Sequence, residues 1–330
     1  MPQRFALFML LAFLVPPTLL SAGQFQKSQV AAKARWVIHS DVTRLVGTDM
    51  GRYLLSQVDG LQGGSRLAVL QALANFDLQR DLSSLTVYGT NAIIEQGVTI
   101  LEGTFDQARI VAGAQRGEAY LEFRHQGHAV HSWMPRSGAS DRGDDGTAAA
   151  VKRLFACFAG PRLLLVSQSY DAVKTGLDVL DGRAPALEAS PLADAMKPST
   201  ASSFLTAVGD LPPGRGAAQH PLLRQTRRVS LDLGEAGSIT EGQLVLLTDN
   251  LQAAGQMFVI LQGMIASAVL QQDQRPELAR FARALRPKVE GNKLRVSVRH
   301  SSQDCLAILK NWRTYLQMLP QSQPQPPGKR

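Results

Sequence analysis

The chain alternates between short runs with β-type patterns and longer runs with helical spacing. The stretches "ARWVIHS" (34–40) and "GVTILEG" predict strands, because they are rich in β-branched and aromatic residues. The stretches "TFDQARIVAGAQ" and "SYDAVKTGLDVLDG" predict helices, and Gly182 is expected to end the second one. This irregular alternation predicts an α+β fold.

Two segments of the chain share a spaced pattern. "VYGTNAIIEQGVTILEGTFDQA" and "LDLGEAGSITEGQLVLLTDNLQAA" align without a gap. The matched pairs are Gly89 with Gly234, Gly97 with Gly242, Leu101 with Leu246, Gln107 with Gln252 and Ala108 with Ala253. The pattern predicts an internal repeat that forms two similar lobes, 29–185 and 200–318. Each lobe is expected to be a mainly antiparallel sheet with helices packed on one face, and the four glycines are expected in turns.

The first lobe carries an insertion, 117–147, that the second lobe does not have. Within it, "EFRHQGHAVHSW" holds three of the six histidines and predicts a hairpin that turns at Gln126-Gly127. In that register His125 faces His128, Glu122 faces His131 and Tyr120 faces Trp133. One face of the hairpin, which carries Leu121, Phe123, Val130 and Met134, is expected to meet the core. The other, which carries His131 and Trp133, is expected to be wetter.

The hairpin tip is the candidate for a metal site. His125 and His128 are close enough across the turn to share an ion, and "SDRGDDG" offers Asp144 as a third ligand. This set would make the protein a metal-dependent, hydrolase-like enzyme. The simpler interpretation is a polar hairpin tip beside a surface loop, which needs no metal.

The N-terminus, "MPQRFALFMLLAFLVPPTLLSAGQ", predicts a signal peptide over 1–23. A charged start at Arg4 precedes an apolar run, 5–15, which is shorter than the ~20 residues that span a bilayer. Cleavage is expected after Gly23, so that the protein is exported to the periplasm or beyond. The alternative is that the segment is kept as an N-terminal anchor.

A second apolar stretch covers residues 250–272. Because Gln252, Gln256 and Gln262 interrupt it, we expect a buried helix and no transmembrane span once the signal peptide is removed. The Pro- and Gln-rich tail, 319–330, cannot bury enough apolar surface to fold and is expected to be disordered.

The two cysteines leave two interpretations open. An exported chain with Cys157 and Cys305 permits one disulfide. Both residues also lie among apolar neighbours, where free cysteine acts as a small hydrophobic side chain.

The net charge of +8 permits a polyanionic partner. The cations are spread along the chain, however, and those of "PELARFARALRP" fall largely off its buried stripe. Since no nucleic-acid motif accompanies them, no nucleic acid is expected as a partner.

No sequence template for a catalytic site or a cofactor is present, so neither catalytic residues nor a cofactor are predicted. The motifs "WVIHSDV", "VYG…GVTILEGTFD" and "VSLDLG…GQLVLLTDNLQAA" resemble those of exported proteins of Planctomycetes-type bacteria. This resemblance implies export but no activity and no site residue.

The sequence therefore favours an exported, non-enzymatic binding or scaffold protein of the bacterial envelope, with an envelope or extracellular ligand. The alternatives are the metal-dependent enzyme and a polyanion-binding protein.

Overall fold

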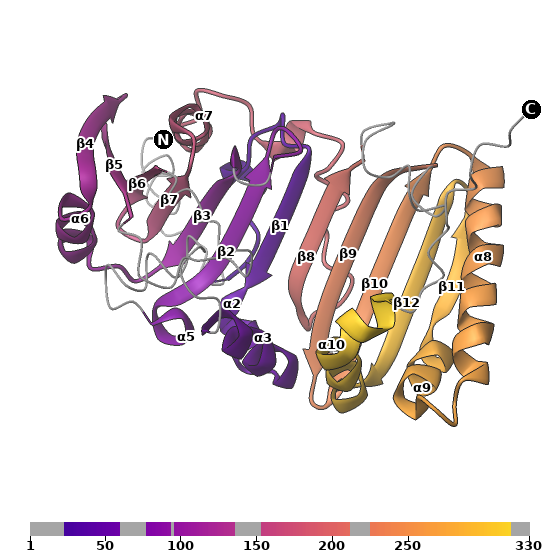
Figure 1. The fold of residues 1–330 in the computed structure, drawn as a ribbon. Helices are drawn as coiled ribbons and strands as arrows, with labels where there is room; N and C mark the ends of the chain where they lie inside the picture. The colour runs from indigo at the N-terminus through magenta and orange to yellow at the C-terminus, as the bar shows by residue number, and fades with distance from the viewer. Residues whose placement is uncertain (1–22, 60–76, 94–95, 136–152, 212–224, 318–330) are drawn as a thin grey trace, which may run out of the picture. The chain divides into compact units, whose positions relative to one another are not determined.

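The structure is a computed structural model that describes residues 23–59, 77–93, 96–135, 153–211 and 225–317 (Figure 1). These residues form two compact units. Unit 1 comprises the described residues of 1–47, 57–197 and 204–207, and unit 2 those of 48–56, 198–203 and 208–330. Each unit combines antiparallel strands with helices, so the predicted α+β class is confirmed.

The sheet of unit 1 has the strand order β1-β2-β3-β7-β6-β5-β4, and each neighbouring pair is antiparallel. Its strands are β1 (Trp36–Asp41), β2 (Leu82–Gly89), β3 (Val98–Gly103), β4 (Glu118–His125), β5 (His128–Met134), β6 (Leu154–Gly160) and β7 (Leu163–Ser167). The predicted insertion therefore supplies the last two strands of this order, β5 and β4.

The helices of unit 1 begin at polar capping residues. They are α2 (Val42–Val46), α5 (Leu78–Asp81), α6 (Gln107–Gln115) and α7 (Tyr170–Leu180), with the 3₁₀ turns η1 (Lys27–Gln29) and η3 (Leu187–Ala189). The carboxylate of Asp106 accepts a hydrogen bond from the backbone N–H of Arg109, and the hydroxyl of Ser169 accepts one from that of Ala172. Helix α7 ends just before Gly182, which has a φ of +72°, as the sequence predicts.

Apolar residues of unit 1 fill both faces of its sheet. Leu164 and Val166 of β7 belong to a core cluster with Ile110 and Ala114 of α6. Leu165, between them in the strand, lies against α7 at Gly176. A strand that is buried on both faces has a continuous run of apolar residues in its sequence, and the "LLLV" of β7 is such a run. Helices therefore cover both faces in unit 1, whereas the sequence pattern indicates one.

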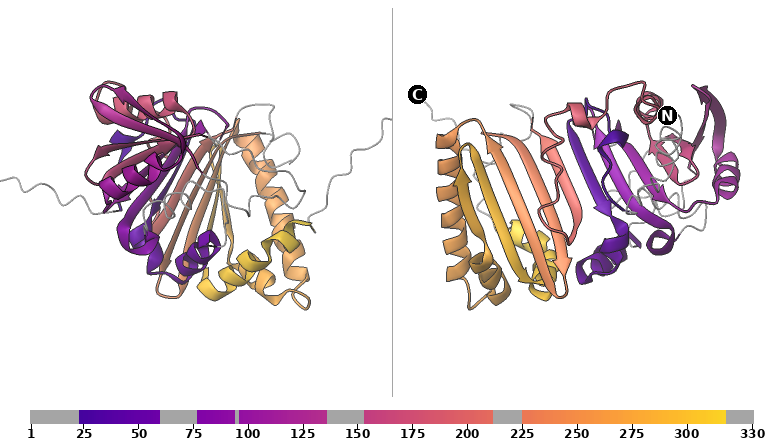
Figure 2. Two further views of the ribbon diagram at one scale, coloured as in Figure 1. Left: turned by 60° about the vertical axis from the view of Figure 1, so that its left-hand side comes forward. Right: turned by 180° about the vertical axis from the view of Figure 1, so that it is seen from behind.

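Unit 2 has the strand order β11-β12-β10-β9, again antiparallel throughout. Its elements are β9 (Thr226–Ala236), β10 (Ile239–Thr248), α8 (Leu251–Leu270), α9 (Pro276–Ala284), β11 (Arg286–Glu290), β12 (Lys293–Ser301) and α10 (Ser302–Gln317). Helices α8, α9 and α10 lie on one face of this sheet (Figure 2). The core there joins Met257 of α8 to Leu246 and Leu294 of the sheet.

Two elements are divided between the units. Strand β8 (Ser203–Asp210) contributes Phe204–Ala207 to unit 1 and its remaining residues to unit 2. Helix α3 (Asp49–Asp59) belongs to unit 2 as far as residue 56. The carboxylate of Glu235 accepts hydrogen bonds there from the backbone N–H groups of Asp49, at 2.8 Å, and Met50, at 3.1 Å. A segment that the sequence assigns to the first lobe is thus capped by a β9 residue.

The strand orders of the two units can be compared with the predicted repeat. The order β2-β3-β7-β6 in unit 1 has its counterpart in β9-β10-β12-β11 in unit 2. At equivalent places the backbone N–H of Gly103 donates to Arg162 O, at 3.0 Å, and that of Thr248 donates to Asn292 O, at 2.9 Å. An origin of both units in one repeated sequence stays a prediction.

Three of the four repeat glycines do not lie in turns, and the prediction is wrong for them. Gly89 ends β2, and Gly234 and Gly242 lie inside β9 and β10. A Cβ atom on Gly89 would lie 2.5 Å from the Trp36 ring, and one on Gly234 would lie 2.7 Å from the Ser202 backbone. Close approach to a neighbouring segment, not a turn, is what these two positions require.

Candidate functional site

The histidine-rich segment forms the predicted hairpin. Gln126 and Gly127 join β4 to β5 with φ values of +51° and +89°, the signs that a type I′ turn needs. His125 is paired with His128 and Glu122 with His131, as predicted. The side-chain period of two and the two-residue turn fix this register.

The hairpin departs from prediction at its base. Ala119 has a φ of +50°, and the register shifts between Glu118 and Leu121. Trp133, expected on the wetter face, is only 1% exposed and belongs to the core cluster that α6 covers. His131 is half-buried, its Nδ1 lies 2.9 Å from the Tyr120 hydroxyl, and burial lowers its pKa.

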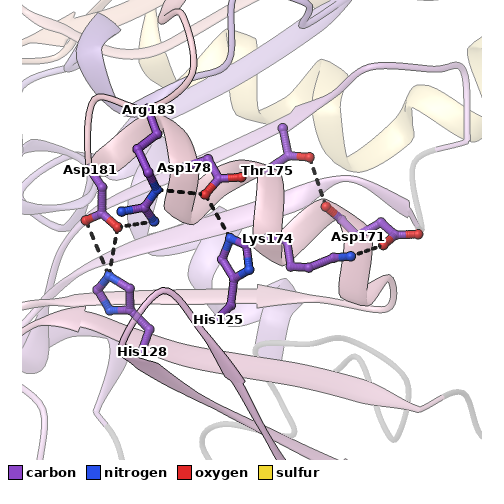
Figure 3. Close-up of polar contacts among 8 residues, drawn as sticks. All are labelled: His125, His128, Asp171, Lys174, Thr175, Asp178, Asp181 and Arg183. Atoms are coloured by element: carbon purple, nitrogen blue, oxygen red, sulfur yellow. Dashed lines mark hydrogen bonds and ion pairs between the residues drawn. The ribbon is translucent and has the colours of Figure 1, made fainter.

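The tip of the hairpin is bound to the C-terminal turn of α7 (Figure 3). Nε2 of His125 donates a hydrogen bond to Oδ1 of Asp178, at 2.8 Å. Nε2 of His128 donates to Oδ2 of Asp181, at 3.0 Å. Two aspartates three residues apart lie on one side of a helix, so they match two histidines that face each other across the turn. We call these four residues and Arg183 the hairpin latch.

Arg183 joins the two aspartates of the hairpin latch. Its Nε lies 3.1 Å from Oδ1 of Asp178, and its Nη2 lies 2.6 Å from Oδ2 of Asp181. The hydrogen bond from His125, with that from Arg183, lowers the pKa of Asp178. Burial by itself raises the pKa of Asp181, but the hydrogen bonds from His128 and Arg183 outweigh burial and lower it. Both carboxylates are thus held in the charged form.

This arrangement fits a structural contact better than a metal site. Asp144, the predicted third ligand, lies outside the described residues. The acids beside the two histidines are Asp178 and Asp181, whose oxygens already accept from imidazole N–H groups and from Arg183. Among the residues that the structure describes, no group of three or more His, Cys, Asp or Glu side chains is placed to hold a metal.

Both cysteines are free, buried thiols. Cys157 lies in β6, where burial raises the pKa of its thiol to about 12. Cys305 lies in α10, and burial raises its pKa as well. A thiol with a raised pKa is a poor nucleophile at neutral pH, so neither cysteine is placed to act as one.

Helix α8 is the second notable feature, and the prediction that it is buried is wrong. It begins at Asn250, whose side chain accepts a hydrogen bond from the N–H of Ala253, and it carries no charged residue. Only 17% of its most apolar segment is buried, because the sheet and α9 cover one side. Five large apolar side chains are exposed: Leu251, Val259, Ile260, Met264 and Leu270. Of the helices described, α8 alone is long and apolar enough to cross a membrane by those two criteria.

Comparisons with known proteins give a distant structural similarity. No known protein family and no curated protein matches the chain. Crystal form III of TP0453, a Treponema protein, matches with a TM-score of 0.47 and 13% identity, over 88% of this chain and 100% of that chain. Crystal form I matches with a TM-score of 0.46 and 10% identity, over 88% and 98% of the two chains. No functional residue is transferred from TP0453, and the resemblance to exported proteins of Planctomycetes-type bacteria stays a prediction.

Proposed function

We propose that this protein is an exported, non-enzymatic binding protein of the bacterial envelope, and that it binds a membrane surface through α8. The observation that carries the proposal is the exposure of apolar side chains along α8, where Val259 is 66% and Leu270 is 85% exposed. Isolated apolar side chains are ordinary on protein surfaces, but a contiguous apolar patch is typical of a contact site.

The energy of such a contact comes from removing apolar surface from water. A large apolar side chain contributes about 1.5–3 kcal/mol when it goes from full exposure to burial. Five partly exposed side chains on one helix therefore supply several kcal/mol, enough for reversible binding to a bilayer.

A lipid surface suits α8 better than a protein partner. Protein interfaces surround an apolar centre with a polar rim that fixes the register of the two partners. The residues from 250 to 272 include no charged side chain, and their large polar side chains are asparagine and glutamine. A fluid bilayer needs no register, and neutral polar side chains can remain at the level of the headgroups.

The polyanion alternative has less support. Several arginines on the strands of unit 2 are paired with carboxylates. The pairs are Arg295 with Glu290, Arg299 with Glu241 and Arg228 with Asp210, at 3.1, 3.1 and 2.7 Å. Paired cations attract a polyanion weakly, because the neighbouring carboxylates repel it.

Co-sedimentation with vesicles of phosphatidylcholine and phosphatidylglycerol tests the proposal. We expect the full chain to bind, and the double variant Val259→Gln/Leu270→Gln to lose most of its binding. The control is Leu121→Gln, which changes an exposed leucine in β4 of unit 1. Failure of the wild-type protein to bind any vesicle would overturn the proposal. So would loss of self-association in the double variant with no change in vesicle binding, because α8 would then contact a second copy of the chain.

A further inference from the structure

We infer that α8 docks on anionic membranes in particular, and that Arg283 and Arg286 bind the phosphate groups of the lipids. The inference rests on the proposed function, because it names the headgroup that the same site recognises. Both arginines are exposed and lie near the C-terminal end of α8, where Leu270 is the most exposed of the large apolar side chains.

A hydrogen bond places Arg283 next to that end, and Arg286 is bonded to the backbone of the same segment. The guanidinium of Arg283, on α9, donates to the side-chain oxygen of Gln272, two residues beyond Leu270. The guanidinium of Arg286, at the start of β11, donates to the backbone carbonyl oxygens of Arg283 and Leu285, the second at 3.0 Å. Arg283 is thus held at the end of the apolar helix, and Arg286 is held three residues further along the chain.

The partners of these arginines are neutral. Arg280, on the same helix, forms an ion pair with Asp304 at 2.7 Å, and Lys288 forms one with Glu290 at 3.0 Å. The hydrogen bonds of Arg283 and Arg286 in the described part of the chain go to an amide oxygen and to carbonyl oxygens, which leave their charge uncompensated.

Other charges on this stretch do not cancel the pair. Between residues 273 and 290 the chain has five cations, Arg275, Arg280, Arg283, Arg286 and Lys288, and three acids, Asp273, Glu277 and Glu290. With Asp304, the ion-pair partner of Arg280, the sum is 5 − 4 = +1. A net positive charge therefore lies beside a helix that has no charged residue.

The chemistry of guanidinium groups suits lipid phosphates. A guanidinium presents paired N–H donors in a plane that matches the oxygens of a phosphate. Each cation near an anionic bilayer strengthens binding by a few-fold, so two of them together are expected to give about thirtyfold. This contribution is electrostatic and should fall as salt is added.

The experiment compares vesicles of phosphatidylcholine alone with vesicles that also contain phosphatidylglycerol. We expect wild-type protein to prefer the anionic vesicles, and Arg283→Gln/Arg286→Gln to lose about thirtyfold on them while its binding to phosphatidylcholine is unchanged. The matched control, Arg227→Gln/Arg299→Gln, removes the same charge from two exposed sites in β9 and β12 and should bind as wild type. Circular dichroism checks that both variants are folded.

The outcomes separate the inference from the proposed function. Equal wild-type binding to both kinds of vesicle overturns the inference and leaves membrane binding through α8 standing. An equal loss in the control variant also overturns it, since net charge alone would then explain the preference. Absence of wild-type binding to either kind of vesicle overturns both.

Discussion

Nε2 of His39 lies 2.9 Å from the backbone carbonyl oxygen of Gly23, and both residues are buried. The other ring nitrogen lies 2.9 Å from the Thr86 hydroxyl. Burial lowers the pKa of His39, and the bond to Gly23 and the charge of Asp41 oppose that effect only in part. The imidazole is therefore neutral near pH 7 and carries one proton. Because a carbonyl oxygen can only accept, this proton lies on Nε2, and the Thr86 hydroxyl donates to Nδ1.

This contact bears on where the mature chain begins. The signal-peptide pattern predicts cleavage after Gly23, which would remove the acceptor of a buried N–H group. A buried donor left without an acceptor costs about 1–3 kcal/mol. We expect a chain that begins at Gly23 to be more stable by about that amount than one that begins at Gln24, as measured by urea unfolding. The control is to repeat the comparison in His39→Leu, where the difference should vanish.

The same contact predicts the processed N-terminus of the exported protein. We expect Gly23 to be retained, so that cleavage occurs on its N-terminal side. Intact-mass measurement of the protein recovered from the envelope decides this directly. A mature chain that starts at Gln24, together with equal stability of the two chains, would show that the contact has no influence.

The hairpin latch predicts a loss of stability in acid. The pKa values of Asp178 and Asp181 lie below the ordinary value of 3.8 in the folded protein. A carboxylate with a lowered pKa stabilises the fold fully above its unfolded pKa, and the stabilisation is lost as the pH falls through the folded value. The contribution of the two aspartates is thus present at neutral pH and disappears below about pH 4.

Replacing both aspartates tests this. Asp178→Asn/Asp181→Asn should be less stable at pH 7 and should lose less stability between pH 5 and pH 2 than the wild type, in urea unfolding across that range. Asp171→Asn is the control, because Asp171 lies on the same helix but is exposed and forms an ion pair with Lys174. An unchanged pH profile in the double variant would show that the latch does not contribute to acid stability.

The sequence predicts local features of this site better than distant ones. The register of the hairpin follows from the alternation of its side chains and from the Gln126-Gly127 turn, both of which are local. The partners of the histidines are 53 residues away along the chain and cannot be found from the hairpin alone. The only signal is a pair of acids three residues apart just before the helix stop at Gly182. In the same way, a buried helix and an exposed helix can have the same apolar composition as α8. The structure distinguishes the two cases, because it shows how α8 lies beside the sheet.

The hairpin tip should not bind zinc, with or without Arg183. In the wild-type protein the guanidinium of Arg183 contacts both carboxylates and repels a cation. Its removal in Arg183→Ala does not assemble a site, because no group of three or more His, Cys, Asp or Glu side chains in the described part of the chain is placed to hold a metal. We expect zinc to leave the melting temperature of both proteins unchanged, because only a ligand that binds the folded state raises it. Stabilisation of the wild type by one equivalent of zinc would restore the metal-site hypothesis.

Glu235 should be required for α3 to remain on unit 2. Its carboxylate is the acceptor for two backbone N–H groups in the first turn of that helix, and it is buried. Loss of a capping group costs about 0.5–2 kcal/mol, and a negative charge at a helix N-terminus adds to the stabilisation. We expect Glu235→Ala to lower the free energy of unfolding by about 2 kcal/mol and Glu235→Gln, which keeps an oxygen acceptor, to lower it by less. Hydrogen exchange should quicken in residues 49–59 of Glu235→Ala.

Glu241→Ala is the control, because Glu241 lies on the adjacent strand and pairs with the exposed Arg299. Equal losses in Glu235→Ala and Glu241→Ala, with exchange in α3 unchanged, would mean that the cap does not hold the helix.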